Sequence, residues 1–97
     1  VPWYHNDFNE RLVMAESNRK IERVQTGVRI EKRILKVLKA LAARNEMGLG
    51  DLIEGIVLHS FEGRHPFEPE TLEFIEQMRS AYGLDLTATD SHKLTEQ

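Results

Sequence analysis

Gln25 and Arg29 lie four residues apart in a short segment of alternating apolar and polar residues, and each side chain can form two hydrogen bonds to one planar partner. Residues 24–30 read Val-Gln-Thr-Gly-Val-Arg-Ile, so that Gln25, Gly27 and Arg29 share one side of an extended chain. An amide matches the hydrogen-bonding edge of adenine, and a guanidinium matches that of guanine. We therefore expect these three positions to be the candidate base-contacting residues of a DNA interface. Gly27 has no side chain to offer, which weakens direct readout at the centre of the segment.

The positive charge of the chain is concentrated around this segment. The 97 residues carry a net charge of −3, yet residues 19–44 hold nine basic and two acidic side chains, or +7. The remaining residues hold four basic and fourteen acidic groups, or −10. A basic stretch of this kind suits a polyanion, although a solvated helix face gives the same composition. The candidate phosphate contacts among the charged residues are Arg23, Lys32 and Arg33.

The alternation over 24–30 is typical of a half-buried β-strand. A lone strand leaves its backbone donors and acceptors unpaired, and no second strand of similar quality follows in the chain. Pairing with the same strand of a second copy would satisfy them. The sequence thus predicts a two-fold homodimer joined by a two-stranded antiparallel ribbon. Its predicted dimer core comprises Val24, Thr26, Val28, Ile30, Leu38, Leu52, Ile53 and Ile56.

Helical periodicity begins where the alternation ends. Apolar residues spaced by three and four predict a helix from about Glu31 to Arg44 and a second from about Leu49 to Phe61, with a turn at 45–48 between them. Gly50 lies near the start of the second helix, where it either permits a close approach or simply weakens the first turn. The amides of Gly48, Leu49 and Gly50, at the positive end of this helix, are further candidate phosphate contacts.

The flanks complete a mostly α-helical chain of four parts. An N-terminal extension covers 1–22, with a predicted helix over 7–22, and the core unit spans 23–63. A loop and a third helix, about 70–82, fill 64–86; Pro69 suits the first helical position and Gly83 the C-terminal end. A polar tail covers 87–97.

The strand–helix–helix order of the core unit resembles the ribbon-helix-helix family of DNA-binding proteins, which includes the Arc and methionine repressors. The resemblance rests on Val28-Arg29-Ile30, on the apolar positions of the first helix, and on Asp51-Leu52-Ile53 after the turn. It covers about forty residues and implies an intertwined dimer whose ribbon enters the DNA major groove. Gly27, and Gly48 in place of a hydroxyl or amide cap, depart from the family's pattern.

Several function classes find little support. The chain has no cysteine, so thiolate metal sites are excluded, and its four histidines show no ligand spacing. No nucleophile, phosphate-loop or paired-carboxylate pattern indicates an enzyme, and no cofactor is expected. No apolar run is long enough for a membrane span, and residues 1–6 do not resemble a secretory signal. We expect a cytoplasmic protein.

Two functions stay open. The first is a homodimeric repressor or antitoxin-like regulator bound to double-stranded DNA, with higher oligomers on DNA an open question. The second is a ribbon-helix-helix dimerisation or protein-interaction module without a physiological DNA target. The acidic residues beside and within the third helix favour the second, because they could dock a basic protein. They are Glu62, Glu68, Glu70, Glu73 and Glu76.

Overall fold

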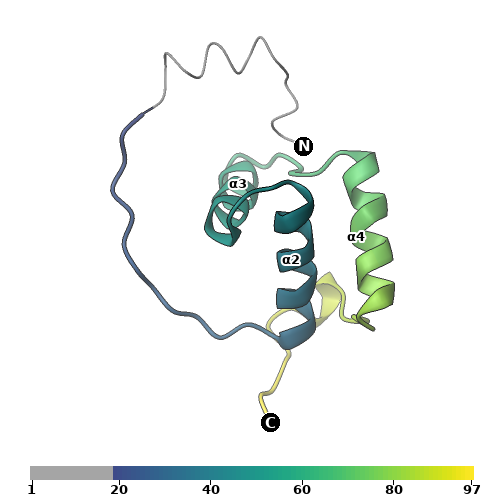
Figure 1. The fold of residues 1–97 in the computed structure, drawn as a ribbon. Helices are drawn as coiled ribbons and strands as arrows, with labels where there is room; N and C mark the ends of the chain where they lie inside the picture. Colours follow the sequence, from purple (N-terminus) through teal and green to yellow (C-terminus); the bar gives the residue numbers. More distant parts are fainter. Residues whose placement is uncertain (1–18) are drawn as a thin grey trace.

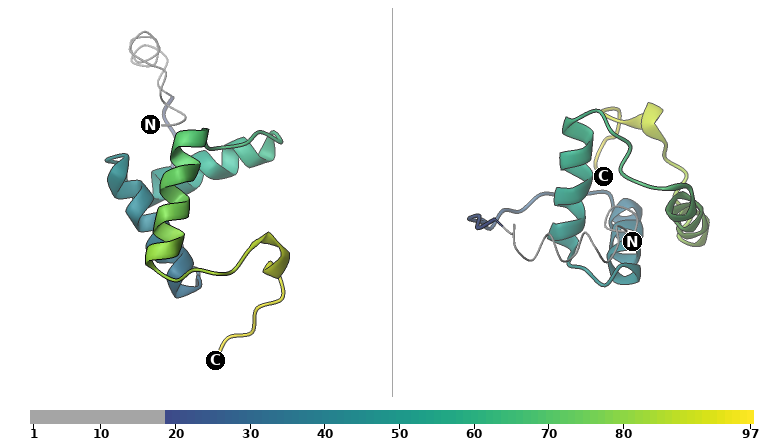
Figure 2. Two further views of the ribbon diagram at one scale, coloured as in Figure 1. Left: turned by 90° about the vertical axis from the view of Figure 1, so that its right-hand side faces the viewer. Right: turned by 90° about the horizontal axis from the view of Figure 1, so that it is seen from above.

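A computed structural model describes residues 19–97, which fold into three α-helices and one short 3-10 turn. The helices are α2 (Lys32–Arg44), α3 (Leu49–Phe61) and α4 (Pro69–Ala81), and the turn is η1 (Ala88–Asp90). Helix α2 is central and packs against both of the others. Residues 19–31, called the arm below, run along the α3 side of α2, whereas α4 lies on the opposite side (Figures 1 and 2).

The helices begin and end within a residue or so of their predicted limits. Glu31 caps α2, because its Oε1 accepts hydrogen bonds from the backbone amides of Arg33 and Ile34 at 2.8 and 3.0 Å. Pro69 occupies the first turn of α4, where its missing N–H costs no helical bond. The sequence predicted the position of Pro69, but not the role of Glu31 as a cap.

All three helices end in the same hydrogen-bonded motif. After each helix one residue turns left-handed: Glu46 (φ 55°), Gly63 (φ 71°) and Gly83 (φ 66°). The amide of the residue that follows each of them bonds back to the last turn, at 3.0, 2.9 and 2.8 Å respectively. Glycine adopts this conformation without steric cost, so Glu46 is the one strained helix end among the three.

A small core fills the angle between the helices. Leu41, Ala42 and Leu52 are buried at its centre. Partly buried apolar side chains from α2, α3, α4 and the loops pack around them: Leu38, Met47, Leu49, Ile56, Phe67, Phe74 and Ile75. Thr71 is the buried residue of α4, while Leu72 is 40% exposed. The core therefore draws on every helix but leaves much apolar surface outside.

The predicted ribbon-helix-helix fold is wrong. No β-strand occurs among residues 19–97, and residues 24–30 are chain without regular secondary structure. Every residue from 19 to 30 is exposed, and Val24 and Val28 are 78% and 73% exposed. The alternating pattern predicted a half-buried strand, but within the described chain no second strand lies beside it to form a ladder. The predictions of a two-stranded ribbon and of an intertwined dimer built on it are therefore also wrong.

The two ends of the chain also differ from expectation. The predicted helix over 7–22 lies mostly outside the described residues, and its last four residues, 19–22, are not helical. The region predicted as a polar tail contains η1, which begins with a reciprocal capping box between Thr87 and Asp90. None of the helices in the described range could cross a bilayer.

Candidate nucleic-acid interface

Arg23 fixes the arm to helix α3. Its Nε and Nη2 donate to the two carboxylate oxygens of Glu54 at 2.9 and 2.8 Å, and Nη2 also reaches Asp51 Oδ1 at 3.3 Å. The hydrogen bond and negative charge of Glu54 raise the pKa of Arg23, and the same hydrogen bond lowers the pKa of Glu54. This two-point contact holds the arm across the beginning of α3.

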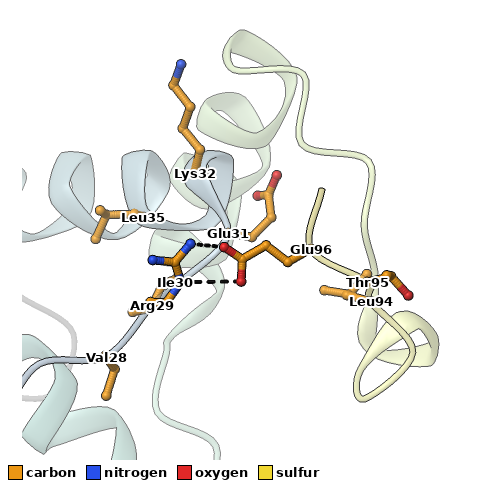
Figure 3. Close-up of a pocket in the computed structure, with 9 residues that line it drawn as sticks. All are labelled: Val28, Arg29, Ile30, Glu31, Lys32, Leu35, Leu94, Thr95 and Glu96. Atoms are coloured by element: carbon orange, nitrogen blue, oxygen red, sulfur yellow. Dashed lines mark hydrogen bonds and ion pairs between the residues drawn. The ribbon is translucent and has the colours of Figure 1, made fainter.

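Arg29 meets the other end of the chain. Its guanidinium forms an ion pair with Glu96, and Nε donates to Glu96 Oε1 at 3.3 Å (Figure 3). Both side chains remain largely exposed, at 83% and 61%. The predicted base-contacting arginine is thus on the surface, where it is bonded to an acidic residue of the same chain.

Arg33 connects the beginning of α2 to the end of α4. Its Nε donates to Glu31 Oε2 at 2.9 Å, and its Nη1 donates to the carbonyl oxygen of Gly83 at 2.9 Å and to Asp85 at 3.2 Å. The hydrogen bond to Glu31 outweighs burial and raises the pKa of Arg33. The structure gives this predicted phosphate contact a role in helix packing.

Glu31 is held as an anion by the same contacts. Burial alone would raise its pKa. The hydrogen bonds from the Ile34 amide and from the side chain and amide of Arg33 outweigh that effect and lower the pKa of Glu31. The carboxylate therefore caps α2 in its charged form.

Two further cations of α2 lie over aromatic rings rather than in open solution. Lys36 Nζ is 5.7 Å from the centre of the Tyr82 ring, and the Arg44 guanidinium is 4.7 Å from that of Phe74. The Lys32 and Lys39 side chains are exposed on α2. Lys32 lies beside Arg29, whereas Lys39 faces the space under the arm.

The beginning of α3 presents backbone donors without a side-chain cap. Gly48 is the N-cap in an extended conformation and makes no side-chain hydrogen bond to the helix. Gly48 and Gly50 are exposed, and a Cβ built on either would meet no atom within 4 Å. Leu49 is half-buried on the core. Asp51 in this first turn would repel a phosphate, but its carboxylate is paired with Arg23.

An open groove of about 850 Å³ lies between the arm and helices α2 and α3. Its lining includes Gln25 and Gly27 of the arm and Ile53 of α3. The arm leaves four large apolar side chains exposed along this groove, Ile21, Val24, Val28 and, at 37%, Ile30. The groove thus combines the predicted DNA-contacting positions with an uncovered apolar surface.

The predicted dimer-core residues fall into two groups. Val24, Thr26, Val28 and Ile30 are exposed on the arm. Leu38, Leu52 and Ile56 belong to the core of the single chain, and Ile53 is half-buried at the groove. Of the predicted dimer-core residues, only those of the arm and Ile53 are therefore available to a second copy.

Sequence reasoning missed the acidic partners of the predicted cations. Glu54 and Asp51 pair with Arg23, and Glu96 with Arg29, across 31, 28 and 67 residues of chain. The segregation of charge into a basic stretch and an acidic remainder was the available signal for such pairing. It could not identify the individual partners, because separations of this length follow from the fold.

No family model, curated protein or solved structure matches the chain.

Proposed function

We propose that the chain is a DNA-binding transcriptional regulator that works as a homodimer in the cytoplasm. The arm and the beginning of α3 form its DNA-contacting surface. The observation that carries the proposal is the exposed arm itself, because residues 19–30 hold cations and a base-complementary Gln25 on accessible backbone. The contact is not made by a β-ribbon, since the described residues form no strand.

The ion pair between Arg29 and Glu96 is of the kind that a polyanion can exchange. The Arg29 side chain is 83% exposed, and exposed pairs contribute only about 0–1 kcal/mol. DNA phosphates at high local density compete well for such cations. Further cations lie along the arm and at the first residue of α2, with Glu22 and Glu31 among them: Arg19, Lys20, Arg23 and Lys32.

The uncapped first turn of α3 adds backbone donors beside these cations. Amides at a helix N-terminus favour an anion, and Gly50 allows a phosphate to approach without meeting a side chain. Arg23 offsets the charge of Asp51 in the same turn. These features support the view that Gly48, Leu49 and Gly50 contact a phosphate next to the arm.

The apolar side chains on the arm support the homodimer. Ile21, Val24 and Val28 are exposed in the monomer, so an association that buries them is favourable. A two-fold contact would use the same apolar patch on both copies. Two arms brought together in this way would also double the positive charge available to DNA.

A protein-interaction module without a DNA target is the second candidate. One observation favours it: the three arginines of the predicted interface all pair with carboxylates of their own chain. In that case the apolar groove under the arm, rather than the arm's cations, would be the working surface, with a protein partner inside it.

Selection from a pool of random duplex DNA tests the proposal. The purified chain is mixed with the pool at several salt concentrations, and the bound fraction is sequenced. Enrichment of a short inverted repeat, with affinity falling steeply as salt rises, is the expected result. Absence of binding even at low salt would reject the regulator in favour of the interaction module.

A further inference from the structure

The segment that follows η1 returns to the arm and lies on its candidate DNA-contacting residues. Leu94, Thr95 and Glu96 border a cavity of about 700 Å³ whose other walls include Ile30 and Lys32 (Figure 3). Glu96 is bonded to Arg29, the position that the proposed function assigns to base contact. One carboxylate thus sits where a DNA phosphate or base edge would have to come.

The course of the chain toward this contact is fixed at three points. Leu84, directly after α4, is buried, and Asp85 is paired with Arg33 at the start of α2. The Thr87–Asp90 capping box then forms η1, with the Thr87 amide donating to Asp90 Oδ2 at 2.8 Å. These anchors restrict where residues 91–97 can go and raise the local concentration of Glu96 at Arg29.

The contact itself is weak enough to be released. The Arg29 and Glu96 side chains are mostly exposed, and Leu94 is only half-covered, at 52% exposed. An exposed pair of this kind is stabilised mainly by proximity and is screened by salt. It can therefore hold the arm in the absence of DNA and give way to a polyanion.

We propose that residues 94–96 are an autoinhibitory segment that competes with DNA for the Arg29 end of the arm. This inference rests on the proposed function. Glu96 supplies the competing negative charge, and Leu94 lines the same cavity as Val28, Ile30 and Leu35. The segment lowers the affinity of every DNA that uses Arg29, because that DNA must first displace Glu96.

A charge-matched pair of variants tests the competition. Glu96→Gln should raise DNA affinity about two- to fivefold, the range expected for loss of one exposed ion pair. Glu73→Gln removes the same charge from the exposed surface of α4, away from the arm, and should change affinity less than twofold. Equal effects of the two substitutions would overturn the proposal, because net charge alone would then explain them.

A spin label observes the segment directly. The chain has no cysteine, so Thr95→Cys creates a single labelling site. A nitroxide there should broaden the NMR signals of Val28, Ile30 and Leu35, and added duplex DNA should restore them. No broadening in the free protein, or broadening that DNA leaves unchanged, contradicts the competition.

The two measurements separate this inference from the function on which it rests. If the wild-type chain binds DNA but Glu96→Gln binds no better than Glu73→Gln, only the autoinhibitory segment is rejected. If none of the three forms binds DNA, the proposed function is rejected and the competition with it. The spin label then still reports whether the segment lies on the arm.

Discussion

Three arginines of one basic stretch have three different environments. Arg23 bonds two carboxylates of α3, Arg29 bonds Glu96, and Arg33 joins the beginning of α2 to the end of α4. The Arg33 side chain is 35% exposed, whereas Arg29 is 83% exposed. Removal of Arg33 should therefore disturb helix packing, while removal of Arg29 leaves the helices unaffected. At the residue scale, Arg29 is the cleaner probe of DNA contact.

Substitution of Arg29 separates base readout from simple attraction. Arg29→Lys keeps the charge but loses the planar fork, so it should preserve non-specific affinity and relax base preference by about 1–3 kcal/mol at one position. Arg29→Ala should weaken non-specific affinity and also relax the base preference. Binding selections with the three proteins measure the two quantities together. Unchanged base preference in Arg29→Lys would assign Arg29 to phosphate contact.

Glu31 gives a second prediction, on the pH dependence of stability. Its pKa is lower in the folded chain than the usual value of 4.5, so its contribution to folding is complete above that value. The contribution is lost as the pH falls below 4.5 through the lowered pKa, because the protonated acid is a poorer cap. Glu31→Gln should remove this part of the pH dependence.

Denaturant unfolding of both proteins between pH 7 and pH 3 measures that effect. The difference in free energy of unfolding between wild type and Glu31→Gln should shrink as the pH falls through this window. Glu73→Gln, on the exposed surface of α4, serves as the control for loss of one charge. A difference that stays constant with pH would show that the charge of Glu31 does not stabilise the helix.

At the scale of elements, the helices were predictable from sequence and the arm was not. Helix limits follow from local signals, namely apolar spacing, Pro69 and Gly83. A strand needs a partner, and the alternation at 24–30 carries no information on whether one is present. The turn after α2 was predicted at 45–48, but no local signal marked Glu46 as its left-handed residue. The pairing of Arg29 with Glu96 depends on the path of the whole chain, which no local pattern encodes.

The beginning of α3 offers an element-scale test. A Cβ at Gly50 meets no atom of the described chain, so Gly50→Ala should leave stability unchanged or raise it by up to about 1 kcal/mol. If a phosphate contacts this turn, the same substitution should weaken DNA binding. Loss of affinity without loss of stability would locate DNA at α3.

A second glycine variant serves as the control for the Gly50→Ala experiment. Gly63 also has open space around it, but its φ of 71° makes Gly63→Ala strained by about 1–2 kcal/mol. This variant should lose stability and keep DNA affinity under conditions where it remains folded. If Gly50→Ala binds DNA as tightly as the wild-type chain does, the phosphate contact at α3 is rejected.

At the scale of the molecule, the described chain buries few apolar side chains and leaves many exposed. Its fully buried side chains at the core are Leu41 and Leu52, while Phe61 of α3 is 81% exposed and the arm carries four exposed apolar residues. A chain of this size gains stability from association, because a second copy covers surface that its own core cannot. The homodimer is therefore a proposal about stability as well as about DNA binding.

Val28→Asp tests association without disturbing the single chain. Val28 is 73% exposed, so the new carboxylate stays hydrated in the monomer and the helices should keep their stability. In a dimer that covers the arm, the same carboxylate would be buried without a partner, which costs several kcal/mol. The variant should therefore be monomeric at concentrations where the wild type is dimeric, as measured by sedimentation equilibrium.

Arg19→Asp at the beginning of the arm introduces the same residue at a solvated position and should leave the dimer intact. A Val28→Asp protein that dimerises as tightly as the wild type would exclude the apolar side of the arm from the interface and move it to the exposed end of α3, where Leu58 and Phe61 lie.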